Sequence, residues 1–190
     1  MLSGSGRLPR FQPPDVVRLL APLDLHLASR EDCDLGRALA AELIGPAIAL
    51  TQTLLRVQAR CGAAIFVQRA EGVVTGVSTL LPLRLEGRRA IESHAFDTRL
   101  PPDELLCAPG DSLAAVYPWG FAARTRRASA AVVSMVIRLR EHWPDIPFYT
   151  RAVTPSGSKV VRGRMGYSPY PGAPDDLLWN PVCTLQERVA

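Results

Sequence analysis

Three arginines stand close together directly before a long apolar run. Arg124, Arg126 and Arg127 precede a segment in which apolar side chains recur with the spacing of a helix: Val132, Val136, Leu139 and Trp143. The N-terminus of a helix carries free backbone N–H groups and the positive end of the helix dipole, so it attracts anions. Guanidinium groups beside it add charged donors. The spacing therefore predicts a binding site for a phosphate-bearing ligand, whereas a solvated surface turn is the simpler alternative.

A strand, a turn and a helix are expected to build this site. The apolar stretch Ala114–Phe121 predicts a buried strand, Ala122–Ala128 a tight basic turn, and the following helix ends before Pro144. Ser129 stands at the start of the apolar run. It is suited either to contact a ligand at the helix N-terminus or to act as a plain N-cap.

Residues 126–131 resemble a known motif. They read Arg-Arg-Ala-Ser-Ala-Ala, which is similar to the pyrophosphate-binding signature of the GNAT superfamily of acyl-CoA-dependent N-acyltransferases: Gln or Arg, two residues, Gly, one residue, then Gly or Ala. Ser129 stands in place of the first Gly, which lets the backbone approach the diphosphate closely. The strand before the motif and the helix after it are the context that the signature needs.

The resemblance implies that acetyl-CoA or another acyl-CoA is the cofactor, bound as a small molecule. It implies that the pantetheine arm lies along Phe121, Ala122 and Ala123, where ordinary strand packing is the alternative. Pro118 removes one backbone donor nearby, as a bulge or an edge position does. The phosphates are expected at seven residues of the turn and the helix start: Arg124, Arg126, Arg127, Ala128, Ser129, Ala130 and Ala131.

Acyl transfer to an amine also needs a base for the amine proton and an acid for the leaving thiolate. Residues 88–96 alternate like a strand, which places Glu92 and His94 on one face, and we predict them as the base. A solvent-facing strand edge is the alternative. Members of the family often carry a tyrosine acid four residues before a Gly-Phe pair, which Gly166-Tyr167 resembles. Arg162 stands at that place, so Tyr167 or Tyr170 is the candidate acid.

The elements before the motif fit the order of the same family. Asp15–Pro22 predicts a first strand, and Ser29–Leu43 predicts a helix with a serine cap. Pro46 is placed to start a second helix, which ends at Arg60 before Gly62. Residues 63–83 predict a hairpin that turns at Glu71-Gly72.

The remaining segments enlarge this pattern. The strand expected over residues 88–96 and the Pro-rich loop after it are an insertion, which we expect to form part of the acceptor pocket. Ile146–Val153 predicts a strand, residues 154–165 a short helix, and Asp176–Val182 a final edge strand.

The predicted fold class is mixed α/β: a single GNAT-like domain with a central, mostly antiparallel sheet of six or seven strands and helices on both faces. The chain of 190 residues is long enough for one buried core. We place the domain at residues 15–183, with a flexible N-terminal tail at 1–14 and a C-terminal tail at 184–190. Residues 38–55 are apolar but interrupted by Glu42 and Gly45-Pro46, so no membrane span is expected.

The composition limits which kinds of binding partner are expected. The net charge is +4, but Lys159 is the only lysine, and we interpret the arginine excess as the codon bias of a GC-rich bacterial genome. Nucleic acid is therefore an unlikely partner, and a homodimer stays open. The four cysteines are widely spaced, without a metal-binding pattern. They favour reduced thiols and a cytoplasmic location.

Three functional hypotheses follow from these patterns. The first is an N-acyltransferase that moves an acetyl or longer acyl group from CoA to an unknown amine by direct attack on the thioester. The second is a GNAT-like module that has lost catalysis and binds a ligand or a partner, which the departures at Ser129 and Arg162 motivate. The third, an enzyme that acts on an RNA-linked amine, rests on the arginine excess alone.

Overall fold

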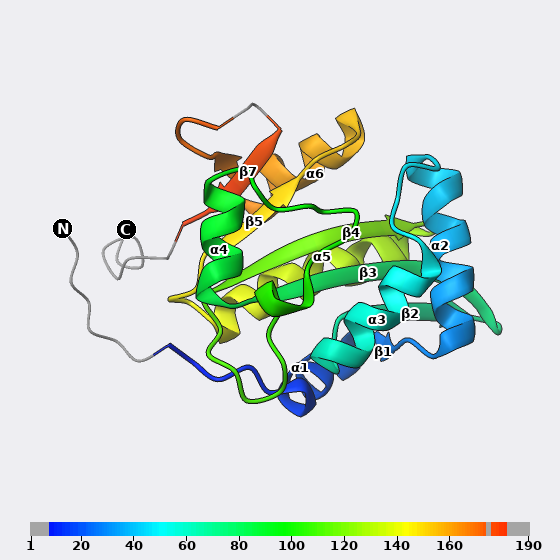
Figure 1. Ribbon diagram of the computed structural model, residues 1–190. Coiled ribbons are helices and arrows are strands. Elements are labelled where there is room, and N and C mark those ends of the chain that lie inside the picture. The colour runs from blue at the N-terminus through cyan, green and yellow to red at the C-terminus, as the bar shows by residue number, and fades with distance from the viewer. Residues whose placement is uncertain (1–7, 174–175, 182–190) are drawn as a thin grey trace.

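The computed structural model describes residues 8–173 and 176–181. Its core is one seven-stranded sheet with the order β1-β2-β3-β4-β5-β7-β6 (Figure 1). All neighbours pair antiparallel except β4 and β5, which are parallel. The strands are β1 (His26–Leu27), β2 (Ile65–Ala70), β3 (Val73–Leu83), β4 (Ala115–Ala123), β5 (Phe148–Arg151), β6 (Ser168–Pro169) and β7 (Leu177–Asn180). The predicted fold class is confirmed.

Helices cover both faces of the sheet. They are α1 (Pro13–Leu20), α2 (Arg30–Ile44), α3 (Thr51–Cys61), α4 (Leu85–Glu92), α5 (Arg126–His142) and α6 (Pro155–Met165). In Figure 1, α2, α3 and α4 lie in front of the sheet and α5 lies behind it. Two neighbouring residues of β3 show the same division, because successive side chains of a strand point to opposite faces. Val77 packs against Gly36 of α2, and Gly76 packs against Ala128 of α5.

The hairpin of β2 and β3 forms where the sequence predicts it. Its turn places Glu71 at φ 50° and Gly72 at φ 80°. Two successive residues with positive φ match the right-handed twist of the flanking strands, and glycine adopts that conformation without strain.

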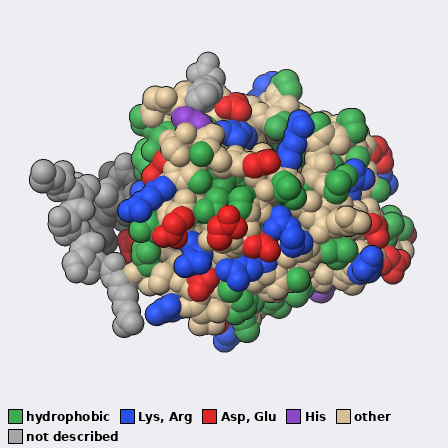
Figure 2. Space-filling view, in the orientation of Figure 1, with side chains coloured by type: hydrophobic (Ala, Val, Ile, Leu, Met, Phe, Trp, Pro, Cys, Tyr) green, Lys and Arg blue, Asp and Glu red, His purple; other side chains and the backbone are tan. Residues whose placement is uncertain are grey.

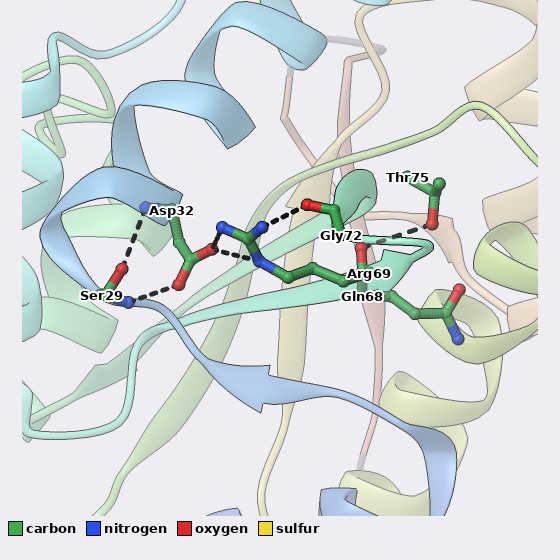
Figure 3. Close-up of polar contacts among 6 residues, drawn as sticks. All are labelled: Ser29, Asp32, Gln68, Arg69, Gly72 and Thr75. Atoms are coloured by element: carbon green, nitrogen blue, oxygen red, sulfur yellow. Dashed lines mark hydrogen bonds and ion pairs between the residues drawn. The ribbon is translucent and has the colours of Figure 1, made fainter.

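The start of α2 is fastened to this hairpin (Figure 3). Ser29 and Asp32 form a capping box in which each side chain accepts a hydrogen bond from the other residue's backbone N–H. The guanidinium of Arg69 on β2 donates to the other carboxylate oxygen of Asp32, Oδ1, from Nε at 3.0 Å and from Nη2 at 2.7 Å. Burial raises the pKa of the Asp32 carboxyl, but the Ser29 hydrogen bonds and Arg69 outweigh it and hold that pKa below its ordinary value.

We expect Asp32→Asn to lower the free energy of unfolding at pH 7 by about 1–3 kcal/mol, because it removes a cap and leaves Arg69 without its counter-charge. A lowered folded pKa means that the contribution is complete above the ordinary value of 3.8 and is lost as the pH falls through the folded pKa. Urea unfolding from pH 2 to pH 7 tests this. The difference between Asp32→Asn and wild type should shrink below about pH 4, whereas Asp34→Asn, exposed on the same helix, should change little at any pH.

The N-terminal segment differs from the prediction. Residues 13–20 form helix α1, so the strand expected over Asp15–Pro22 is wrong. Prolines are tolerated at the first helical positions, and Val16 and Leu20, one turn apart, are both buried. Phe11 is fully buried, and its carbonyl accepts a hydrogen bond from Gly110 N at 2.8 Å. The packed fold therefore begins before Asp15, where the sequence places the end of a flexible tail.

The expected strand over residues 88–96 is also wrong. Helix α4 runs to Glu92, and the chain then turns through His94 at φ 62°. The residues that alternate also contain an ion pair with helical spacing: Arg88 Nε lies 2.9 Å from the carboxylate of Glu92, four residues later. Glycine 87 fits this helix tightly, since a Cβ there would lie 2.5 Å from the Leu105 carbonyl oxygen.

Two further elements differ from the prediction, the second helix in its start and the last strand in its place in the sheet. The first long helix is confirmed, but α3 begins at Thr51 and not at Pro46, so residues 45–50 form a loop. Strand β7 lies between β5 and β6, which makes β6 the edge and corrects the expected edge strand at Asp176–Val182. The predicted C-terminal tail at 184–190 lies outside the described residues.

Candidate functional site

The parallel strands β4 and β5 separate soon after they meet. Their ladder holds a single register pair, Val116 with Phe148. Pro118 follows on β4 and has no N–H to continue the ladder, and its carbonyl accepts a hydrogen bond from the Thr150 hydroxyl at 2.9 Å. The sheet therefore opens beyond Pro118, close to the bulge or edge that this proline predicts.

The other side of β4 stays paired with β3 across a bulge. Pro118 pairs with Leu80 and Gly120 with Thr79, so Trp119 is the extra residue. Past the end of the strand, Arg124 N donates to Thr75 O at 2.8 Å.

The direction of the backbone groups along β4 follows from this pairing. Successive residues direct their N–H and C=O groups to opposite neighbours. Because the N–H of Arg124 is directed toward β3, the backbone N–H and C=O groups of Phe121 and Ala123 are directed to the other side, where β5 no longer pairs with β4. Free backbone donors and acceptors thus line the opening at the residues predicted to meet the pantetheine arm.

A cavity of about 590 Å³ occupies this opening. Its walls come from α2 and residues 45–49, from β3, from β4 as far as Phe121, and from residues 150–154 and the first turn of α6. Leu54 of α3, Val161 of α6 and Asp176 also line the cavity, and Thr98 and Arg99 of the insertion complete the lining. Trp119 holds them in place, because its indole N–H donates to the Thr98 carbonyl at 2.6 Å.

Helix α5 begins at the far end of the opening, where β4 ends. Its N-cap is Thr125, whose hydroxyl accepts a hydrogen bond from Ala128 N at 3.1 Å, while Ser129 N donates to the Thr125 carbonyl at 2.9 Å. The helix therefore starts at Arg126, three residues earlier than predicted, and Ser129 lies inside its first turn and is not the cap. The first N–H groups of a helix lack intrahelical acceptors, so Arg126 and Arg127 present theirs at this end.

The three arginines of the motif are exposed around this helix end. Arg124 pairs with Glu42 of α2 at 2.5 Å and Arg127 with Asp24 at 3.1 Å. Arg126 forms no ion pair with any residue in the described ranges. Exposed ion pairs contribute little to stability, so an anion at the helix N-terminus can recruit all three guanidinium groups at small cost.

The small residues of the motif let the helix approach the sheet. The side chains of Ala122, Ala128 and Ala131 are buried, whereas Ala130 is exposed and Ser129 half-buried. A Cβ built on Gly76 would lie 2.9 Å from the Ala128 Cβ, closer than side-chain carbons normally come. The position of the α5 N-terminus over β3 therefore depends on the missing side chain at Gly76.

We expect Gly76→Ala to displace the first turn of α5 and to weaken the binding of the phosphate-bearing ligand predicted from the sequence, with acetyl-CoA as the probe, by about tenfold, which corresponds to about 1.4 kcal/mol. Gly163→Ala is the matched control, because a Cβ at Gly163 meets no atom within 4 Å. Calorimetric titration of both variants measures the effect. Equal affinities in the two variants would show that this close contact does not set the site.

The predicted bases lie elsewhere. Glu92 accepts hydrogen bonds from the Tyr149 hydroxyl at 2.5 Å and from Arg88 Nε at 2.9 Å. Burial and this contact with Glu92 raise the pKa of Tyr149. His94 is exposed in the turn after α4, and neither residue lines the cavity. Glu92 thus ties α4 to β5, and the structure does not bring this pair to the opening.

The predicted tyrosine acids also lie outside the cavity lining. Burial raises the pKa of Tyr167, whose hydroxyl has no hydrogen-bond partner among the described residues. Tyr170 packs against Tyr149 and Trp179. Arg162 is exposed on α6, and Val161 is the residue that reaches the cavity there.

Tyr117 and Asp176 line the cavity but are not indicated by the sequence as site residues, whereas Arg151, which also lines it, follows the predicted strand at a point expected to border the cofactor arm. Burial raises the pKa of the Tyr117 hydroxyl to about 12, with Arg151 opposing and Asp176 adding to the shift. Arg151 Nε lies 3.3 Å from the Asp176 carboxylate. The sequence offers one signal for Tyr117: it lies two residues before Trp119 on the strand that leads into the phosphate motif, so both are candidates for the same face of that strand.

A sheet that opens between two parallel strands, with a helix N-terminus at the mouth of the opening, is the arrangement of the GNAT fold. Comparison with solved structures shows the same class. The chain is similar to a GNAT-like decarboxylase, GphF, in complex with isobutyryl-CoA: TM-score 0.52, 20% identity, covering 73% of this chain and 71% of that one. It is also similar to a proposed acetyltransferase from Staphylococcus aureus Mu50: TM-score 0.54, 13% identity, covering 83% and 98%.

These likenesses show the fold of the chain. No protein-family model and no curated protein sequence matches the chain.

The surface carries charges of both signs. On the face shown in Figure 2, basic and acidic side chains are interspersed, and the described residues there form no continuous basic surface. Within the described ranges, every helix is too short or too polar to cross a bilayer.

Proposed function

We propose that the protein is an acyl-CoA-dependent N-acyltransferase. The observation that carries this proposal is the gap between β4 and β5, which leads from the α5 N-terminus into a cavity of about 590 Å³. A long ligand with a phosphate at one end and a reactive group at the other fits that path. The GNAT-like structure in complex with isobutyryl-CoA supports this choice of ligand.

Two segments would hold the acyl-CoA. The diphosphate lies at the N–H groups of Arg126 and Arg127, with the arginine side chains around it. The pantetheine arm takes the place of the missing strand and bonds to the free backbone groups of Phe121 and Ala123. Both sets are among the cofactor-binding residues predicted from the sequence.

The transfer itself needs one bond made and one broken. The amine nitrogen attacks the thioester carbonyl carbon, the C–N bond forms, and the C–S bond breaks. Tyr117 stays protonated near neutral pH and gives its proton to the leaving thiolate. Asp176, the carboxylate among the cavity-lining residues, accepts the proton that the amine loses. Solvent then exchanges both protons.

Titration calorimetry with acetyl-CoA, octanoyl-CoA and free CoA tests the binding step, followed by a thiol-release assay with a panel of amines. We expect micromolar binding of at least one acyl-CoA and an amine-dependent release of free CoA. If none of the three ligands binds, the proposal is wrong.

A catalytically degenerate GNAT-like module is the second candidate. One observation favours it: the Asp176 carboxylate, the only one among the described cavity-lining residues, is already paired with Arg151 at 3.3 Å. On this hypothesis acyl-CoA binds, but no amine in the panel accelerates the release of CoA. Tyr117→Phe would then leave every measured property unchanged.

A further inference from the structure

The side chains that line the cavity carry more positive than negative charge. Four ionisable side chains that can carry a full charge at pH 7 line it: Arg37, Arg99, Arg151 and Asp176. Arg151 and Asp176 neutralise each other. Neither Arg37 nor Arg99 has a carboxylate within ion-pairing distance among the described residues. Two guanidinium charges therefore remain uncompensated in the lining.

The structure holds Arg37 in position without using up its donors. Its Nε–H donates to the Ala49 carbonyl at 3.1 Å, which orients the half-buried guanidinium against the loop after α2. No described protein group accepts a hydrogen bond from its two terminal nitrogens. The planar fork of donors that matches a carboxylate remains available.

The backbone that carries Arg99 is equally well defined. The Asp97 carboxylate accepts hydrogen bonds from the N–H groups of Arg99 at 2.7 Å and Leu100 at 3.2 Å. Trp119 fastens the neighbouring Thr98 to β4. These contacts fix the loop, while the Arg99 side chain is exposed and makes no hydrogen bond or ion pair with a described residue.

Both arginines lie on the opposite side of the sheet from the phosphate site. Arg37 belongs to α2, which packs on the Val77 side of β3, whereas α5 packs on the Gly76 side. In Figure 1 the same two helices lie in front of and behind the sheet. Arg124, Arg126 and Arg127 do not line the cavity, so the phosphate site has its own arginines. Arg37 and Arg99 are left to face the second substrate.

We propose that Arg37 and Arg99 select an amine acceptor that bears a carboxylate, so that the preferred acceptors are amino acids and not simple amines. This inference rests on the acyltransferase function proposed above. A carboxylate in the cavity that these two residues line compensates their charge and sets the direction from which the amine reaches the thioester carbonyl.

Matched pairs of acceptors test the proposal: phenylalanine against phenethylamine, and methionine against 3-(methylthio)propylamine. With wild type and acetyl-CoA, kcat/KM for the amino acid should exceed that for the amine by about tenfold or more. Arg37→Gln and Arg99→Gln should each lower kcat/KM for the amino acid by about tenfold, through KM, and leave the amine and acetyl-CoA constants within about twofold. Arg89→Gln, exposed on α4 outside the cavity, is the control.

Binding of the reaction products separates this inference from the proposed function. N-acetylphenylalanine should bind wild type about tenfold more tightly than N-phenethylacetamide, and Arg37→Gln should remove the difference. This difference without any acyl transfer would support the carboxylate site and contradict the acyltransferase function. Equal binding of both products, or a preference that survives both glutamine variants, would overturn the inference.

Discussion

Arg126→Glu is expected to weaken the binding of acetyl-CoA by about 100-fold or more. The change removes a charge-assisted hydrogen bond to phosphate and places a carboxylate beside it, a loss of about 3 kcal/mol. Arg126 is the first residue of α5 and forms no ion pair with a described residue, so the substitution disrupts no internal contact of this kind. Titration calorimetry at low ionic strength measures the effect, and added salt should weaken wild-type binding.

Arg30→Glu provides the matched control. Arg30 is the first residue of α2, is exposed like Arg126, and lies at a helix N-terminus outside the motif. An acidic residue there suits the helix dipole, so the variant should fold well and bind acetyl-CoA as tightly as wild type. If both variants lose affinity equally, net charge and not the α5 N-terminus governs binding.

Tyr117→Phe is expected to lower kcat by about 100-fold while the dissociation constant of acetyl-CoA changes by less than about twofold. A general acid contributes on this scale, and its removal affects the chemical step and not the binding of the thioester. The Tyr117 hydroxyl donates to no described protein group, so the variant should keep the stability of wild type. Single-turnover kinetics separates the chemical step from product release.

Tyr170→Phe is the companion variant, because Tyr170 packs in an aromatic cluster outside the cavity lining. Its kcat should stay within about twofold of wild type. A large loss with Tyr170→Phe and none with Tyr117→Phe would assign the role of acid to Tyr170, one of the two tyrosines predicted from the sequence.

Sequence patterns predict the elements around the α5 motif well, because turn chemistry is local. Glu71-Gly72 can hardly be anything but a tight turn between two apolar strands. Ser29 with an acidic first turn predicts a helix start, and the structure adds the capping box. The sequence does not indicate Thr125 as the cap, because the apolar run begins only at Ser129, three residues after the first helical residue, Arg126.

The cavity lining could not be predicted in the same way. The prediction of Glu92 and His94 as bases rests on an alternating pattern over residues 88–96. The same residues also allow a helix, in which Arg88 and Glu92 lie one turn apart and form an ion pair. The structure has this helix, and Glu92 bonds there to both Tyr149 and Arg88. Tyr117 and Asp176 are far apart in the sequence and meet only through the order of the strands. Contacts between residues so far apart in the sequence cannot be read from the spacing of neighbouring residues.

The short ladder between β4 and β5 is also the shortest pairing between two neighbouring strands of the sheet, so we expect the parts on its two sides to differ in stability. Within the sheet, the Val116–Phe148 pair, the bond from Val116 N to Pro147 O at 3.1 Å and the Thr150 hydroxyl join strands β5, β7 and β6 to the four-stranded part, and outside it the Tyr149 hydroxyl bonds to Glu92 of α4. The smaller part can therefore open while the larger part keeps its protected amides. An elongated ligand seated in the seam spans both parts, so binding should slow amide hydrogen exchange in β5, which lines the cavity, and also in β7, whose residues do not. Ligand binding would thus make two cooperative units behave as one.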